Sequence, residues 1–148
     1  MSSKAWTIIG SGFGIYGYLP ALAEVTDDAL FLPERYREKL LLRPELSHLE
    51  HRVTWITNDH EIFEQVDSII LAVPPNIQQQ KILELINYEK IQHFLLEKPV
   101  AASPSASQNV LELLKSRGKD VRIGYTFFYA KWFDGFRFPF AHNASKVT

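Results

Sequence analysis

Short runs of β-branched and aliphatic residues alternate with longer amphipathic segments along almost the whole chain. This alternation predicts strands that are separated by helices, with right-handed crossovers and parallel strand pairing. The expected strands are residues 6–9, 29–32, 53–57, 68–73, 94–96 and 121–125. We therefore predict an α/β fold, a doubly wound and mostly parallel six-stranded sheet in the order 3-2-1-4-5-6, with helices on both faces.

The segments between these strands carry helix start and stop signals. Asn58 and Glu61 form a capping pair, Ser103 and Pro104 suit an N-cap and a first helical residue, and Gly118 suits a stop. We expect helices over residues 16–25, 34–50 with an interruption at Pro44, 58–65, 76–87 and 103–118.

Composition narrows the class of partner. The chain has 148 residues, a length typical of one domain, with 16 basic against 17 acidic residues. A nucleic-acid surface or an anionic membrane surface needs a basic excess, so neither is expected as the main partner. The chain has no cysteine, and its longest aliphatic run, residues 69–73, is too short to span a bilayer. A cytoplasmic location is the default prediction.

A glycine cluster follows the first expected strand and opens the first expected helix. Glycines there allow a tight turn and a close backbone approach to a pyrophosphate, and the N–H groups at the start of the helix favour an anion. The candidate cofactor-binding residues are Gly10, Gly12, Phe13, Gly14 and Ile15. The usual dinucleotide spacing places its third glycine where this chain has Ile15. The pattern also fits the S-adenosylmethionine loop of methyltransferases, or a tight turn with no ligand.

Glu34 and Arg35 stand at the end of the second expected strand, about twenty residues beyond the glycines. An acidic residue at this position accepts from the ribose hydroxyls of NAD, whereas an arginine pairs with the 2′-phosphate of NADP. The chain has one of each, so the cofactor is predicted as NAD or NADP. Both side chains also suit a solvated surface.

Two further strand ends carry candidate site residues. The fourth strand ends in Val73, Pro74 and Pro75, and Gln78 follows with Asn76 between them. Ligands of such folds bind beyond the carboxyl ends of the strands, so these residues are candidates for the nicotinamide ribose, although Asn76 equally suits a helix cap.

The fifth strand ends in Glu97 and Lys98, which we expect at the same edge. A lysine there can exchange a proton with a substrate hydroxyl, which makes Lys98 the candidate catalytic residue. His48 and His51 are three residues apart without an evident third ligand, so no metal site is predicted.

The last part of the chain is rich in aromatic residues. Nine of the sixteen residues from 125 to 140 are Phe, Tyr or Trp. Exposed together, they would form an interface patch, so we expect a homo-oligomer or a second domain to meet them, the alternative being a loop folded back on the core. The predicted domains are residues 1–126, which bind the dinucleotide, and residues 127–148, an aromatic tail or the start of a substrate domain.

Four motifs together resemble the Gfo/Idh/MocA oxidoreductases, named for glucose–fructose oxidoreductase and inositol dehydrogenase. They are GSGFG followed by LPAL, then AVPP, then EKP, then Gly124-Tyr125, and the resemblance covers residues 5–130. It implies a Rossmann domain followed by a C-terminal α/β domain, and oxidation or reduction of sugars, inositols and related hydroxy compounds with NAD or NADP, often in dimers or tetramers.

Carried over by position, the resemblance assigns roles. The three glycines would contact the pyrophosphate, Glu34 or Arg35 the adenosine ribose, and Pro74, Pro75 and Glu97 the nicotinamide side, with Lys98 in the catalytic site. The chain departs from the family at Gln78, where many members have histidine, and at Phe128, where arginine is common. The family's substrate domain would begin near Thr148.

The sequence thus predicts the NAD(P)-binding domain of an oxidoreductase that acts on sugar or polyol CH–OH groups, incomplete for catalysis alone. Its substrate would be a small sugar-like molecule bound with the help of a second domain. The alternative prediction is a non-catalytic module of the same fold that dimerises or docks on a partner through its aromatic tail.

Overall fold

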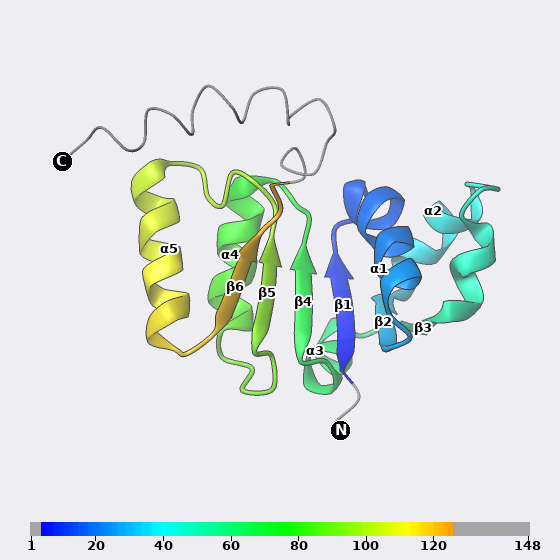
Figure 1. Cartoon of the computed structure of the whole chain (residues 1–148), viewed down its shortest axis with the longest axis horizontal. Coiled ribbons are helices and arrows are strands. Elements are labelled where there is room, and N and C mark those ends of the chain that lie inside the picture. The colour runs from blue at the N-terminus through cyan, green and yellow to red at the C-terminus, as the bar shows by residue number, and fades with distance from the viewer. Residues whose placement is uncertain (1–3, 126–148) are drawn as a thin grey trace, which may run out of the picture.

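The computed structural model of the chain describes residues 4–125. Its six strands are β1 (Ala5–Ile9), β2 (Ala29–Pro33), β3 (Val53–Ile56), β4 (Ser68–Leu71), β5 (His93–Leu96) and β6 (Asp120–Ile123). They form one sheet in the order β3-β2-β1-β4-β5-β6, and every neighbouring pair is parallel. The predicted fold class and strand order are confirmed. The carboxyl ends of the strands therefore lie at one edge of the sheet (Figure 1).

The helices occupy the segments between the strands. The α-helices are α1 (Leu19–Val25), α2 (Arg37–Leu41), α3 (Asp59–Gln65), α4 (Pro75–Leu85) and α5 (Pro104–Ser116). A π-helical turn, η1 (Gly14–Tyr18), leads into α1, and the 3₁₀ segments η2 (Glu34–Tyr36) and η3 (Ser47–Arg52) flank α2. The expected caps are present, since Asn58 accepts from the His60 N–H and Ser103 accepts from the Ala106 N–H, both at 3.1 Å.

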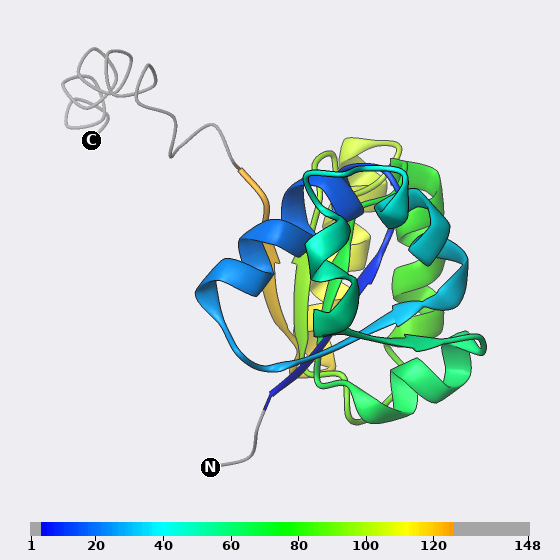
Figure 2. The same cartoon turned by 90° about the vertical axis from the view of Figure 1, so that its right-hand side faces the viewer.

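Alternation along the strands builds a core on each face of the sheet. Ile69 and Leu71 of β4 pack with the helices α3, α4 and α5, whereas Ile70 packs on the other face with residues of η1, α1 and α2. Figures 1 and 2 show α1 and α4 on opposite faces of the sheet. All four residues of β4 are buried, as expected for a central parallel strand covered on both sides.

The helix after β1 starts earlier than the sequence predicts and begins with a widened turn. It starts at Gly14 instead of residue 16, and the Leu19 N–H donates to the Gly14 carbonyl, an i→i+5 bond. Pro20 is the second residue of α1; it has no N–H, and in a regular α-helix its ring would crowd the carbonyl of residue 16. The π-helical turn gives that ring room.

The segment between β2 and β3 also differs from its expected form. The sequence predicts helix over residues 34–50 with a break at Pro44, whereas the structure divides the segment into η2, the short α2 and η3. The tail beyond residue 126 lies outside the described residues, so the domain boundary stays a prediction. In the part of the chain that is described, no helix is long and apolar enough to cross a membrane.

One buried polar atom lacks a partner and generates a stability prediction. Thr7 of β1 is 1 % exposed, and its Oγ1 makes no hydrogen bond. A buried hydroxyl without a partner is destabilising, so Thr7→Val should raise the free energy of unfolding by about 1 kcal/mol. Urea denaturation followed by tryptophan fluorescence measures it. Thr54→Val, at an exposed position of β3, is the matched control, for which we expect no gain in the free energy of unfolding. A urea midpoint of Thr7→Val equal to or below that of the wild type would contradict the prediction.

Candidate functional site

The glycine turn connects β1 to its helix beside the end of β4. Gly10 has a φ of +130°, and a β-carbon on it would come within 2.1 Å of the Ala72 carbonyl oxygen. A β-carbon on Gly14 would come within 2.8 Å of the Ile8 side chain. Around Gly12, in contrast, a β-carbon would meet nothing within 4 Å. Two glycines thus allow close packing of the chain, and the third leaves open space at the surface.

Phe13 and Ile15 have different surroundings, although both were candidates for cofactor contact. The Phe13 ring is 52 % exposed and packs over Gly17, with its centroid 5.1 Å from that of Tyr18. Ile15 is fully buried in the core beneath α1 and α2. The third glycine of a dinucleotide turn permits close packing of helix against strand. Here Gly14 has that role, and Ile15 fills the core.

The ends of β4 and β5 lie side by side, because Leu71 pairs with Leu96. Gln78 of α4 is fully buried and joins the two ends. Its Nε2 donates to the carbonyls of Glu97 (2.8 Å) and Val100 (3.0 Å), and its Oε1 accepts from the Glu97 N–H (3.1 Å). In this structure the Gln78 amide therefore holds the loop after β5 and presents no surface to a ligand.

The Glu97 side chain is also held in place. Its Oε1 accepts a hydrogen bond from the Tyr18 hydroxyl, which links the turn η1 to the end of β5. Burial, and then this hydrogen bond to a carboxylate, raise the pKa of Tyr18 far above its ordinary value, so the phenol remains a donor at neutral pH. A β-carbon on Gly124 would come within 2.3 Å of the Tyr18 hydroxyl, so the chain after β6 packs closely over the pair.

Lys98 follows directly and is exposed at the same edge of the sheet. The peptide bond between Lys98 and Pro99 is cis. Pro74 is also exposed, Val73 and Pro75 are half-buried, and Pro75 is the first residue of α4. The arrangement thus combines a glycine turn, a held carboxylate and an exposed lysine at the ends of three adjacent strands, β1, β4 and β5. It can bind an extended ligand across the edge and exchange a proton at the lysine.

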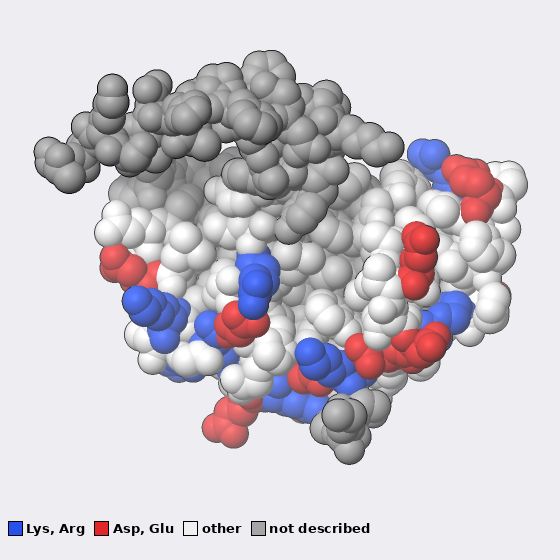
Figure 3. Space-filling view, viewed as in Figure 1, with Lys and Arg blue, Asp and Glu red and all other residues white. Residues whose placement is uncertain are grey.

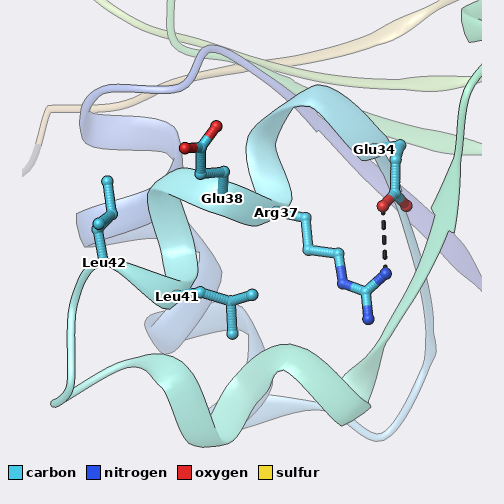
Figure 4. A pocket seen from close by; sticks show the side chains of 5 residues that line it. All are labelled: Glu34, Arg37, Glu38, Leu41 and Leu42. Carbon is cyan, nitrogen blue, oxygen red and sulfur yellow. Dashed lines mark hydrogen bonds and ion pairs between the residues drawn. The ribbon is translucent and has the colours of Figure 1, made fainter.

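The two ribose candidates after β2 are both engaged in ion pairs. Arg35 binds Asp59 with two hydrogen bonds of 2.5 and 2.8 Å, and these raise the pKa of the Arg35 guanidinium. The Glu34 carboxylate faces Arg37 at 3.2 Å (Figure 4), and Arg37 also binds Glu50.

A hollow of about 430 Å³ lies beside α2, lined by Glu34, Arg37, Glu38, Leu41 and Leu42 (Figure 4). Of the predicted site residues it includes only Glu34, so it is separate from the glycine turn and from the ends of β4 and β5. Among residues 4–125 there is no group of three or more His, Asp or Glu side chains placed to hold a metal ion.

Sequence reasoning missed three side chains that contact the predicted site. Tyr18 binds Glu97, the Tyr36 hydroxyl accepts from the Gly10 N–H at 3.2 Å, and Lys39 Nζ donates to Ser11 Oγ at 2.8 Å. Tyr36 and Lys39 are three residues apart in a helical segment, a spacing that indicates a shared face. No local pattern pointed to Tyr18.

A dinucleotide fits this set of residues. The open space around Gly12 allows the backbone approach that a pyrophosphate needs, whereas the Ile15 and Tyr16 N–H groups already donate to the Gly12 carbonyl, at 3.0 and 3.2 Å. The turn would hold the pyrophosphate at Gly12, with Gly10 and Gly14 allowing the close packing that shapes the turn, and the ends of β4 and β5 would receive the nicotinamide half.

Comparison with known proteins points the same way. A family model described as "Oxidoreductase family, NAD-binding Rossmann fold" (GFO_IDH_MocA) matches residues 4–125. This match decides between the ligand classes that the glycine pattern left open. No curated protein sequence matches the chain.

Solved structures share the fold at low sequence identity. One is KijD10, a 3-ketoreductase from Actinomadura kijaniata in complex with NADP and TDP-benzene, with a TM-score of 0.67 and 15% identity over 87% of this chain and 39% of that one. Another is UDP-N-acetylglucosamine 3-dehydrogenase GnnA from Acidithiobacillus ferrooxidans, with a TM-score of 0.62 and 17% identity over 84% of this chain and 39% of that one.

A third is a super-repressor mutant of Gal80p from Saccharomyces cerevisiae, with a TM-score of 0.62 and 14% identity over 82% of this chain and 34% of that one. The chain thus spans little more than a third of each of these proteins.

The glycine geometry predicts opposite effects for two alanine substitutions. Gly10→Ala should destabilise the fold by more than about 2 kcal/mol, because a β-carbon would clash with the Ala72 carbonyl at an unfavourable φ. Gly12→Ala should change stability by less than about 1 kcal/mol and instead weaken nucleotide binding. Thermal unfolding of both variants measures the change in stability, and nucleotide titration measures the change in binding. Equal stability losses would contradict it.

Tyr18→Phe tests the link between η1 and β5. Loss of the hydrogen bond to Glu97 should destabilise the protein by about 1 kcal/mol at pH 7, a value reduced from that of a buried charged pair because both groups are partly solvated. Tyr88→Phe, whose hydroxyl instead contacts His60 at the surface, is a control with a smaller expected effect.

The same variant carries a pH dependence. The folded-state pKa of Tyr18 is raised, so its stabilising contribution is complete below the ordinary tyrosine pKa of about 10 and is lost as the pH rises above it. The stability gap between the wild type and Tyr18→Phe should begin to narrow at about pH 10 and should narrow further as the pH rises from there toward the raised folded-state pKa. A gap that widens in this range would refute the assignment.

Proposed function

Because the chain belongs to the Gfo/Idh/MocA oxidoreductase family through its NAD-binding Rossmann fold, we propose that it is the cofactor-binding part of an enzyme acting on sugar or polyol CH–OH groups. When bound, the nicotinamide supplies hydride transfer to or from the substrate carbon. The glycine turn binds and orients the cofactor. Lys98 takes the proton from the substrate hydroxyl or returns it, depending on direction.

The observation that carries this proposal is the support of the loop after β5. Gln78 holds the Glu97 backbone from α4, and Tyr18 holds its carboxylate from η1. Two elements that come from different parts of the chain thus fix the residue directly before Lys98. Such support is typical of a residue that must be positioned against a bound ligand.

Support for a sugar-like substrate comes from the solved proteins of the same fold. One is a UDP-N-acetylglucosamine 3-dehydrogenase, and another is a 3-ketoreductase in complex with NADP and TDP-benzene. These proteins are much longer than this chain, so we propose that substrate binding needs a second domain or another chain. Orientation of the reacting groups contributes on the order of 7–11 kcal/mol to catalysis, and without that domain turnover should be very slow. The cytoplasmic location stays a prediction.

Fluorescence titration of the 148-residue chain with NADH and NADPH tests the proposal. At least one should bind, S-adenosylmethionine should not, and Gly12→Ala should weaken the binding. Mixing the chain with NAD⁺ or NADP⁺ and UDP-N-acetylglucosamine should give no steady nucleotide reduction. Absence of any dinucleotide binding would refute cofactor binding, and steady turnover at ordinary enzyme rates would refute the need for a second domain.

A second candidate function is a non-catalytic module that dimerises or docks on a partner. One protein of the same fold is a super-repressor mutant of Gal80p. On the sheet face that carries α1, no described helix covers β5 and β6 (Figure 1), and a hollow of about 180 Å³ there is lined by residues that include Trp6, Leu95 and Arg122. Figure 3 shows charged side chains over the middle and the lower edge of this face, with uncharged surface between them.

The aromatic stretch 125–140, which lies outside the described residues except for Tyr125, is the proposed contact segment for a homo-oligomer or partner. A non-catalytic docking module should form an assembly and should bind neither NADH nor NADPH. Light scattering measures the assembly, and the fluorescence titration measures the binding. A monomer that binds NADH or NADPH would exclude the docking module.

A further inference from the structure

One side of the segment after β2 faces the glycine turn. The Tyr36 hydroxyl accepts from the Gly10 N–H (3.2 Å), and Lys39 Nζ donates to Ser11 Oγ (2.8 Å). Further along, the Arg43 guanidinium lies 4.1 Å from the centre of the ring of residue 16. Contacts at positions 36, 39 and 43 follow a helical repeat. They place the Lys39 ammonium at the glycine turn.

Lys39 differs from its basic neighbours in its partner. Arg35 binds Asp59, Arg37 binds Glu34 and Glu50, and Arg43 lies 3.5 Å from Glu45. In the described part of the chain, the partner of Lys39 is the neutral hydroxyl of Ser11. Among the described basic residues at positions 35, 37, 39 and 43, Lys39 is therefore the one that no carboxylate neutralises.

The Lys39 and Ser11 side chains suit a phosphate. An ammonium carries three donors and a serine hydroxyl can rotate to donate, so an anionic oxygen placed between Nζ and Oγ accepts from both. A lysine binds phosphate as a point charge, and its gain is largest where no carboxylate competes. Both conditions hold at this pair.

The position of the pair selects which phosphate of the cofactor it meets. In a doubly wound fold the adenosine ribose lies between the glycine turn and the end of β2, where its 2′-position is read. Ser11 belongs to the turn, and Lys39 reaches it from the segment after β2. Glu34, the residue that would bind a free 2′-hydroxyl, is paired with Arg37.

We propose that Lys39 and Ser11 bind the 2′-phosphate of the adenosine ribose, so that the chain prefers NADP to NAD; this rests on the proposed cofactor-binding function. Arg35, the residue that the sequence pattern suggests for this role, stays in its ion pair with Asp59.

The test is fluorescence titration of the full chain with NADPH and NADH, at two salt concentrations. Variants are Lys39→Met, Lys39→Arg and Ser11→Ala. The matched control is Lys90→Met, which removes an exposed lysine in the loop before β5, at the opposite edge of the sheet. Circular dichroism and thermal unfolding check that each variant is folded, which is expected because Lys39 is exposed.

The wild type should bind NADPH more tightly than NADH. Lys39→Met should weaken NADPH binding about tenfold or more, and NADH binding less than about threefold. Ser11→Ala should also weaken NADPH binding more than NADH binding, but by a smaller factor. Lys39→Arg should retain most of the preference for NADPH over NADH, and Lys90→Met should change neither affinity. NADPH binding should lose part of its salt dependence in Lys39→Met, and 2′-AMP should displace NADPH better from the wild type than from this variant.

Other outcomes overturn the inference. Equal weakening of NADPH and NADH in Lys39→Met would assign Lys39 to the pyrophosphate, and unchanged affinities or a wild-type preference for NADH would exclude the 2′-phosphate contact. In each of these cases the proposed function survives. If the wild type binds neither dinucleotide, the proposed function itself fails, and this inference fails with it.

Discussion

At the end of β1 the chain passes so close to the backbone of Ala72 that residue 10 has no room for a β-carbon. This contact brings the glycine turn after β1 against the end of β4, and β1 and β4 are the neighbouring strands between which the strand order reverses. Tyr36 holds the Gly10 N–H from the other side. The ligand-binding edge is therefore assembled around one backbone approach, and the contacts of η1 and α2 follow from it.

The ending of β5 on Glu97, Lys98 and Pro99 is physically demanding, because a strand from the core stops on charged residues. The structure meets this demand locally. Gln78 satisfies the backbone of the loop, and Tyr18 satisfies the carboxylate. The supports come from both faces of the sheet, since α4 and η1 lie on opposite sides of it. Lys98 and Pro74, which follow the adjacent strands β5 and β4, are both exposed.

Much of the fold was predictable because the strands and helices have local sequence patterns of apolar and capping residues. The apolar run of β4, the caps at Asn58 and Ser103 and the alternation of strands with helices each rest on near neighbours in sequence. The start of the helix after β1 was not predicted, because a π-helical turn before Pro20 has no separate sequence signal. Likewise, the glycine that packs against β1 is Gly14, one residue before the expected position.

The sequence by itself determined the parallel sheet, the order of its strands and part of the set of residues at its carboxyl edge, without Tyr18, Tyr36 and Lys39. Only the tertiary structure decided what those residues do there. Gln78 is buried against a loop 19 residues away, Arg35 is paired across 24 residues, and Lys39 meets Ser11 across 28. Periodicity reports which face a residue occupies, and it carries no information about partners brought from distant strands. For that reason the sequence predicted the carboxyl edge of the sheet as the site, but it did not predict the side-chain contacts at that edge.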